Sequence, residues 1–155
     1  MNSFKPLDLN YESRIKESFS RQRFMDFINA ELVEVKPGYC EIHLPYKKKF
    51  SQQHGYFHAG LIGTIADNCG GYAAFSLMPA EASVLTVEYK INIVAPGDGE
   101  LLIGRAKVIK PGRTLTVCEA KVFVVKSGVE KLCATSLMTV MVMHGKADAP
   151  SSDRK

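Results

Sequence analysis

Residues 59–78 most constrain this chain, because they carry only one side chain that is charged at neutral pH. The run AGLIGTIADNCGGYAAFSLM contains the acid Asp67 and is otherwise apolar, small or uncharged. It predicts a long helix packed inside a domain, and its four glycines, Asp67 and Asn68 argue against a membrane span. Burying a carboxylate without a partner is costly, so Asp67 requires a function or a compensating contact.

Small residues recur along this predicted helix at spacings of three and four. The resulting face comprises Gly60, Gly63, Asp67, Gly70 and Ala74. Each glycine inside a helix costs roughly 0.5–1 kcal/mol relative to alanine, so their repetition needs a reason. The face predicts close approach by a partner helix, by a narrow ligand, or by both. Plain helix packing, with Asp67 hydrogen-bonded across it, is the simpler interpretation. The side predicted to pack on a sheet carries Leu61, Ile62, Ile65, Cys69 and Ala73.

Beyond the helix the hydrophobic period changes to the two-residue period of a strand. In SVLTVEYKINIVA the alternation predicts the two faces of one half-buried antiparallel strand. One face would carry Leu85, Val87, Tyr89, Ile91, Ile93 and Ala95, and the other Thr86, Glu88, Lys90 and Asn92. The turns PGDGE, PGR and KSG separate three further predicted strands.

Upstream of the long helix, residues 11–28 show amphipathic spacing, and Pro37 and Gly38 predict a turn within a strand pair or one kinked strand. One apolar helix and one antiparallel sheet predict an α+β domain in which the curled sheet packs on the helix. We therefore divide the chain into an N-terminal helical segment at 1–29, a main domain at 30–144 and a disordered tail at 145–155.

The composition is that of a soluble globular protein, with 46% hydrophobic and 23% charged residues. The first residues show no basic segment followed by an apolar core, which predicts a cytoplasmic protein.

The four cysteines are scattered and are interpreted as reduced core residues; they are Cys40, Cys69, Cys118 and Cys133. The net charge of +4 is mild, and the basic run 47–49 lies in no nucleic-acid module. A solvated loop explains that run, although a polyanionic small molecule would also suit the charge.

The stretch HGYFHAGLIGTIADNCGGYAA resembles the H-G-G…A-D signature of hotdog-fold acyl-CoA thioesterases of the phenylacetate-pathway type, the PaaI-like family. The resemblance covers about residues 30–143 and includes His58, Gly60, Asp67 nine residues after that histidine, and the Gly-Arg turn in KPGRT. It implies that the predicted sheet and helix form a hotdog fold, a curled antiparallel sheet wrapped around one long central helix.

The same resemblance assigns catalytic roles around the helix. It implies that Asp67 activates water or attacks the thioester carbonyl directly. The backbone N–H of Ala59, with Gly60 adjacent, would hold the carbonyl oxygen, and His58 would orient the turn. A helix N-terminus suits a developing oxyanion, because its first N–H groups are unpaired and lie at the positive end of the helix dipole. Here Ala59 stands in place of the family glycine; it keeps the N–H but restricts the backbone.

Further site residues are implied by their positions relative to the motif. Gln52 corresponds to a family asparagine, with a longer side chain, and Thr86 to a serine or threonine at the start of the next strand. The Gly-Arg turn is implied to lie near coenzyme A phosphates. The residues assigned to substrate binding are Lys110, Gly112, Arg113, His54 and Tyr56. An acyl pocket could be lined by Tyr56, Phe57, Tyr72 and Phe75.

Helix geometry adds a constraint that does not depend on the family. Eight residues separate Ala59 from Asp67, which is roughly 12 Å along a helix axis. One thioester carbonyl can hardly contact both. If both act, Ala59 must come from a second subunit, which predicts a homodimer, or a homotetramer built as a dimer of dimers, with sites at a symmetric interface.

Parts of the sequence also suit functions other than thioester hydrolysis. His54 and His58 have the spacing of zinc ligands on a helix, but no third ligand is evident. The chain lacks the G-x-S-x-G motif of serine hydrolases, and Cys69 is interpreted as a core thiol. An acyl-thioester hydratase or dehydratase that pairs His58 with Asp67, and a non-catalytic acyl-CoA sensor, remain alternatives. We expect a thioesterase acting on medium- or long-chain acyl-CoA, with no metal or cofactor and neither nucleic acid nor membrane as partner.

Overall fold

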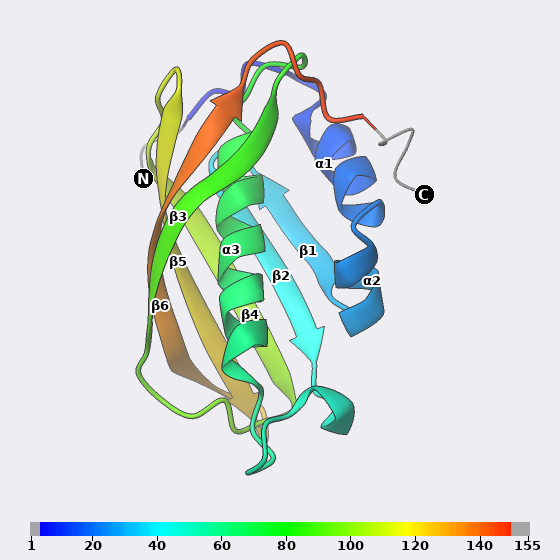
Figure 1. Ribbon diagram of the computed structural model, residues 1–155, viewed down its shortest axis with the longest axis vertical. Coiled ribbons are helices and arrows are strands. Elements are labelled where there is room, and N and C mark those ends of the chain that lie inside the picture. Colours follow the sequence, from blue (N-terminus) through cyan, green and yellow to red (C-terminus); the bar gives the residue numbers. More distant parts are fainter. Residues whose placement is uncertain (1–3, 150–155) are drawn as a thin grey trace.

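The computed structural model describes residues 4–149, in which one antiparallel sheet curls around one central helix (Figure 1). The elements are α1 (Tyr11–Ser20), α2 (Arg23–Ile28), β1 (Glu31–Lys36), β2 (Tyr39–Pro45), the 3-10 helix η1 (Lys48–Phe50), α3 (Ala59–Phe75), β3 (Ser83–Ile93), β4 (Leu101–Lys110), β5 (Leu115–Lys126) and β6 (Val129–Met143). The strand order is β1-β2-β4-β5-β6-β3. The predicted α+β hotdog architecture is confirmed.

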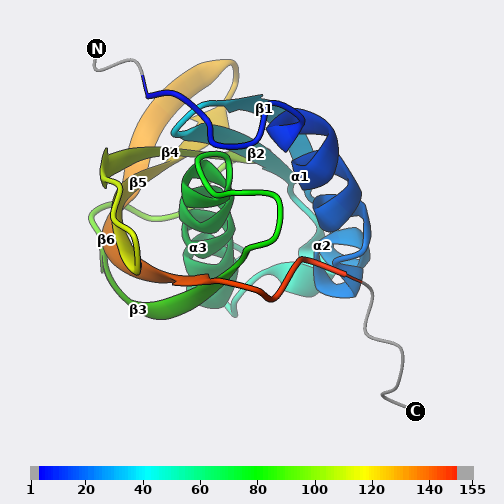
Figure 2. The ribbon, with the colours of Figure 1, turned by 90° about the horizontal axis from the view of Figure 1, so that it is seen from above.

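The sheet surrounds α3 on most sides, and α1 and α2 cover the side next to β1 (Figure 2). The turn between β1 and β2 contains Gly38 with φ of +77°, a left-handed conformation that favours glycine. The predicted strand pair at this turn is therefore present. Among residues 4–149, no helix is both long enough and apolar enough to cross a membrane.

The core forms where α3 meets the inner face of the sheet. The helix residues predicted to pack on the sheet are all buried. On β4, Gly104 permits a close approach of the helix, because a Cβ there would lie 2.4 Å from Ile65 Cγ2 and 2.7 Å from Cys69 Sγ. All four cysteines are free and buried, as predicted. Burial raises the pKa of Cys69 well above its ordinary value, which makes this thiol a poor nucleophile.

The predicted faces of strand β3 are partly wrong because the strand contains a β-bulge. Thr86 pairs with Val140 of β6, and Glu88 pairs with the next residue, Thr139, so that Val87 is extra. A bulge inserts one residue and reverses the alternation beyond it. Thr86 therefore faces the helix together with Tyr89, and not the outer face together with Glu88. The strand is also more exposed than predicted, with Leu85 57%, Val87 53% and Tyr89 45% exposed.

The predicted small-residue face of α3 is also partly wrong. Gly70 is buried against β6, where a Cβ would lie 1.7 Å from Met138 Sδ, and Gly63 is buried next to the Tyr89 hydroxyl. These two glycines admit side chains of the same chain and not a partner helix. The face left at least partly exposed comprises Gly60, Thr64, Asp67, Asn68 and Gly71. Asp67 belongs to both sets, so it remains accessible.

The N-terminal helices are attached to the end of α3 by Arg14. Its guanidinium donates hydrogen bonds to the carbonyl oxygens of Pro79 (2.6 Å), Met78 (2.8 Å) and Phe75 (3.3 Å). The last carbonyl groups of a helix lack intrahelical donors and lie at the negative end of its dipole, so a cation is well placed there. Asp8 lies 3.2 Å from Arg14 Nε and balances its charge.

Part of the predicted tail, 145–155, contacts the helical segment. Arg21, directly after α1, pairs with Asp148 at 2.5 Å. Residues 150–155 of that predicted tail, and residues 1–3 of the predicted N-terminal segment, lie outside the described residues.

Replacing Arg14 should destabilise the domain. Arg14→Met would leave three partly buried carbonyl groups without their donor, so we expect urea unfolding to show a loss of about 2 kcal/mol. The control is Lys16→Met on the same helix, where the ion pair with Glu12 is exposed and the change should stay within about 0.5 kcal/mol. Equal losses in both variants would refute a specific role for Arg14.

Candidate active site

The Asp67 carboxylate lies half-buried on α3 and is held by one side chain of the sheet. Its Oδ1 accepts a hydrogen bond of 2.8 Å from Thr86 Oγ1, and the bulge in β3 is what turns Thr86 toward the helix. Burial raises the pKa of Asp67 above its ordinary value of 3.8, and the Thr86 hydrogen bond opposes part of that rise. A carboxylate in this state is a stronger base than one in water.

Among residues 4–149, the N-terminus of α3 presents one backbone N–H without an acceptor, that of Ala59. His58 caps the helix, and its Nδ1 accepts a hydrogen bond of 2.9 Å from the N–H of Gly60. The next two N–H groups, of Leu61 and Ile62, donate to the carbonyl oxygen of His58. Within residues 4–149, the Ala59 N–H donates to no acceptor. Ala59 therefore offers the donor that the resemblance implies, whereas Gly60 uses its own N–H in the cap.

The loop before α3 holds the side chain of Gln52 close to its own backbone. Gln52 Oε1 accepts a hydrogen bond from the N–H of His54, and the Gln52 N–H donates to the Tyr56 carbonyl oxygen at 2.9 Å. The N–H of His58 donates to Phe50 at 3.4 Å, which ties the loop to the start of the helix. The predicted residues of this loop thus gather around the N-terminus of α3. Ala59, the first residue of α3, lies about 12 Å along the helix axis from Asp67.

The predicted coenzyme A turn lies at the opposite end of α3. Lys110 is the last residue of β4, and Gly112 and Arg113 form the turn into β5 (Figure 1). Only glycine fits at 112, because a Cβ would lie 2.2 Å from the Leu115 carbonyl oxygen. The His144 ring donates a hydrogen bond of 2.6 Å from Nε2 to the Arg113 carbonyl oxygen and so fixes the turn.

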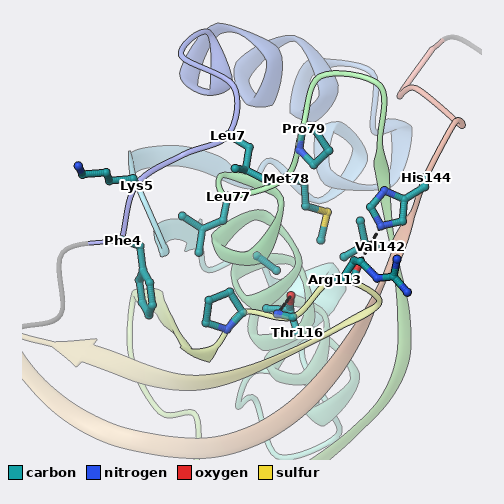
Figure 3. Close-up of a pocket in the computed structure, with 13 residues that line it drawn as sticks. Phe4, Lys5, Leu7, Leu77, Met78, Pro79, Arg113, Thr116, Val142 and His144 are labelled. Atoms are coloured by element: carbon teal, nitrogen blue, oxygen red, sulfur yellow. Dashed lines mark hydrogen bonds between the residues drawn. The ribbon is translucent and has the colours of Figure 1, made fainter.

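A cavity of about 390 Å³ opens between this turn and the C-terminal end of α3 (Figure 3). Its lining includes Phe4, Lys5, Leu77, Met78, Arg113 and His144. The sequence does not predict this cavity. Among its lining residues, only Gly112 and Arg113 are predicted to bind substrate. No local motif connects its four segments, which are far apart in the chain and meet only in the fold.

Three of the four aromatic residues predicted for an acyl pocket are core residues. Phe57, Tyr72 and Phe75 are 3%, 4% and 0% exposed, and only Tyr56 is partly accessible. The Tyr72 hydroxyl accepts a hydrogen bond of 2.7 Å from Gln22, which binds the ring to the N-terminal helices. An aromatic residue that the motif did not indicate, Tyr89, lies over Gly63, one turn from Asp67.

The raised pKa of Asp67 implies a cost to stability at neutral pH. Folding then favours the protonated form of Asp67. The penalty to folding stability is therefore absent at pH values well below the ordinary pKa of an aspartate and fully present above the raised pKa of Asp67. We expect Asp67→Asn to raise Tm at pH 7.5 by roughly 1–4 °C, with the gain shrinking toward pH 4. The control Asp98→Asn loses an exposed ion pair with Lys126 and should show no gain. A gain that does not change with pH would contradict the ionisation argument.

Comparison with known proteins places this geometry in a family. Residues 54–131, half of the chain, match the thioesterase superfamily. The chain is 44% identical to a thioesterase family protein from Silicibacter pomeroyi, with 87% of this chain and 99% of that chain covered and a TM-score of 0.86.

Two more distant structures show the same fold. They are the E. coli PaaI protein from the phenylacetic acid degradation operon (16% identity, 90% and 98% covered, TM-score 0.79) and a Haemophilus influenzae thioesterase (20%, 94% and 96%, 0.76). The resemblance to hotdog-fold thioesterases is thereby confirmed, and the chain belongs to the thioesterase superfamily and has the hotdog fold.

Proposed function

We propose that this protein hydrolyses medium- or long-chain acyl-CoA to the free acid and CoA. Family membership supports thioester hydrolysis as the class of reaction. The observation that carries the proposal is the Asp67 carboxylate. It is partly desolvated, accepts a hydrogen bond from Thr86 and is still accessible on α3. The basic turn at Lys110 and Arg113 supports a phosphate-bearing substrate such as acyl-CoA, because lysine and arginine bind phosphates by charge-assisted hydrogen bonds.

Asp67 acts as general base or as nucleophile. As a base it takes a proton from a water molecule whose oxygen attacks the thioester carbon; the C–S bond then breaks and CoA leaves as the thiol. As a nucleophile it attacks that carbon itself; the C–S bond breaks, and CoA leaves as the thiolate and takes a proton from water. A second water molecule then hydrolyses the mixed anhydride between Asp67 and the acyl group. Thr86 holds the carboxylate in position in either route. Neither route needs a cofactor, since water is the only second reactant.

The carbonyl oxygen is bound by the Ala59 N–H of a second subunit. Within one chain this donor and Asp67 are about 12 Å apart along α3, so one thioester cannot contact both. In a two-fold dimer with antiparallel α3 helices, Asp67 of one chain lies near Ala59 of the other. An N–H at this position stabilises the oxyanion that develops as the carbonyl is attacked.

The edge strand β3 supports such a dimer. It is the last strand of the sheet and pairs only with β6 among the described residues. Its apolar side chains Leu85, Val87 and Tyr89 are 45–57% exposed, and unpaired apolar edge strands are otherwise a liability for aggregation. Pairing of two β3 strands around a two-fold axis would cover them and bring the two α3 helices side by side. We propose this homodimer as the active unit, which could pair further into a tetramer.

Thiol release from short-, medium- and long-chain acyl-CoA and from phenylacetyl-CoA tests the activity. Wild type should release CoA fastest from medium or long chains, and Asp67→Asn should lose at least about 100-fold in kcat. Ala59→Pro removes the oxyanion donor at a helix position that suits proline, and should cost roughly 100- to 1000-fold. Absence of thiol release from every substrate by a folded wild type would refute the thioesterase proposal.

Complementation between the two inactive variants tests the shared site. In a mixed dimer of Asp67→Asn with Ala59→Pro, one site receives an intact Asp67 and an intact Ala59 N–H from different chains. Random subunit mixing should therefore restore roughly a quarter of the wild-type activity. If both groups of a site came from one chain, mixing would restore nothing. Size-exclusion chromatography with light scattering checks that each variant remains a dimer.

A further inference from the structure

We propose that a surface formed by α2 and η1 docks on a lipid bilayer that contains anionic lipid. This docking surface comprises Arg23, Phe24, Phe27, Lys47, Lys48, Lys49 and Phe50. It includes none of the residues of the proposed catalytic site, so the inference does not depend on the thioesterase proposal. Peripheral docking needs no membrane-spanning helix. The proposal therefore replaces the expectation that a membrane is not a partner.

Three phenylalanine rings form one continuous patch on the docking surface. The rings of Phe24 and Phe27 stack with their centroids 6.5 Å apart, and Phe27 meets Phe50 edge to face at 5.4 Å. Phe24 is 52% and Phe27 59% exposed. Single exposed apolar residues are common, whereas a contiguous apolar patch marks an interaction surface. The contact with Phe50 explains how η1 is held against α2, but not why two rings remain more than half exposed.

Basic side chains surround these rings. Lys49 Nζ lies 5.0 Å from the ring centroid of Phe27 and 4.7 Å from that of Phe50, so charge and rings share one surface. Residues 23–29 and 47–50 contain four basic residues and one acid, Asp26, which gives a net charge of +3. Asp26 lies two positions after Phe24 and thus on nearly the opposite side of α2. A cluster of about four cations beside exposed rings suits an anionic bilayer, where rings enter the interface and cations meet the headgroups.

Two other occupants fit the docking surface less well. Single-stranded nucleic acid stacks its bases on the faces of aromatic rings. Here the Lys49 ammonium lies over the rings of Phe27 and Phe50 and competes for those faces. If the surface instead met the same surface of a second copy, like charges would face each other across the two-fold axis.

The docking surface is held in place and lies away from the proposed dimer edge. Lys47 donates a hydrogen bond to the side chain of Asn29 at the end of α2, and the carbonyl oxygen of Phe50 accepts one from the His58 N–H. These contacts tie η1 to α2 and to the start of α3, which lowers the cost of ordering on binding. The strand order ends in β1 on one side and β3 on the other, and α2 covers the side next to β1 (Figure 2). Pairing of two β3 strands therefore does not itself use α2.

Co-sedimentation with lipid vesicles tests the docking surface. Wild type should bind vesicles of phosphatidylcholine and phosphatidylglycerol at least about tenfold more tightly than vesicles of phosphatidylcholine alone, and less tightly at high salt. Phe24→Ser/Phe27→Ser should weaken binding at least about tenfold through the lost rings. Lys48→Gln/Lys49→Gln should do the same, because each cation near an anionic surface is worth about fivefold.

Two matched controls should bind like wild type. Leu9→Ser removes an apolar side chain that is 88% exposed before α1. Lys107→Gln/Lys121→Gln removes the same charge as the lysine variant, from exposed positions on β4 and β5.

A fluorescence measurement tests ring insertion without removing an aromatic ring. The chain contains no tryptophan, so the single indole of Phe24→Trp reports on that position alone. Its emission should shift to shorter wavelength when vesicles containing phosphatidylglycerol are added, because an indole in the membrane interface leaves water. The emission of Leu9→Trp should not shift.

Three results would overturn the proposal. One is wild-type protein that binds no vesicles containing phosphatidylglycerol. A lower mass of Phe24→Ser/Phe27→Ser in light scattering would then identify a contact between copies, and binding of a single-stranded oligonucleotide would identify a nucleic-acid surface. The second is vesicle-bound Phe24→Trp with unshifted emission. The third is binding of Phe24→Ser/Phe27→Ser equal to that of wild type, which would leave only non-specific attraction of charges.

Discussion

The close packing of an uncharged helix inside a curled sheet is the contact on which the rest of this structure depends. Gly104 of β4 lets Ile65 and Cys69 approach the sheet, and Gly70 admits Met138 of β6. With its sides buried in this way, α3 exposes only one narrow stripe. A polar group on that stripe is partly desolvated by the surrounding sheet without being sealed from solvent. Asp67 occupies this position, and its raised pKa follows from it.

Two local irregularities then convert this packing into a site. The bulge in β3 turns Thr86 toward the helix, where it donates a hydrogen bond to the Asp67 carboxylate. The cap at His58 uses the Gly60 N–H, and among the described residues that of Ala59 has no acceptor. Each feature costs regular hydrogen bonding or packing, as is common where a protein positions reactive groups. In the proposed mechanism, Asp67 and the Ala59 N–H of one chain lie on the same helix but too far apart to act on one carbonyl.

The segments outside the central helix and sheet have a defined structural role. Arg14 attaches α1 to the carbonyl end of α3, and His144 fixes the turn that carries Arg113. The chain before α1 passes the same end of α3 and completes the cavity with Phe4 and Lys5. Residues from both ends of the described chain therefore surround a cavity next to the helix that carries Asp67.

The sequence by itself determined the element order, the buried side of α3, the reduced cysteines and the family, because these follow from local periodicity and from one contiguous motif. It also singled out Asp67, Ala59 and Thr86.

Tertiary structure alone decided which residues face one another. The bulge at Val87 reversed the predicted face of Thr86, since one extra residue flips the alternation of a strand. Gly63 and Gly70 proved to admit Tyr89 and Met138, because helical spacing identifies a face but not what packs on it. The cavity brings together residues 4–7, the end of α3, the 111–113 turn and His144, and no local pattern encodes contacts between segments so far apart in the chain.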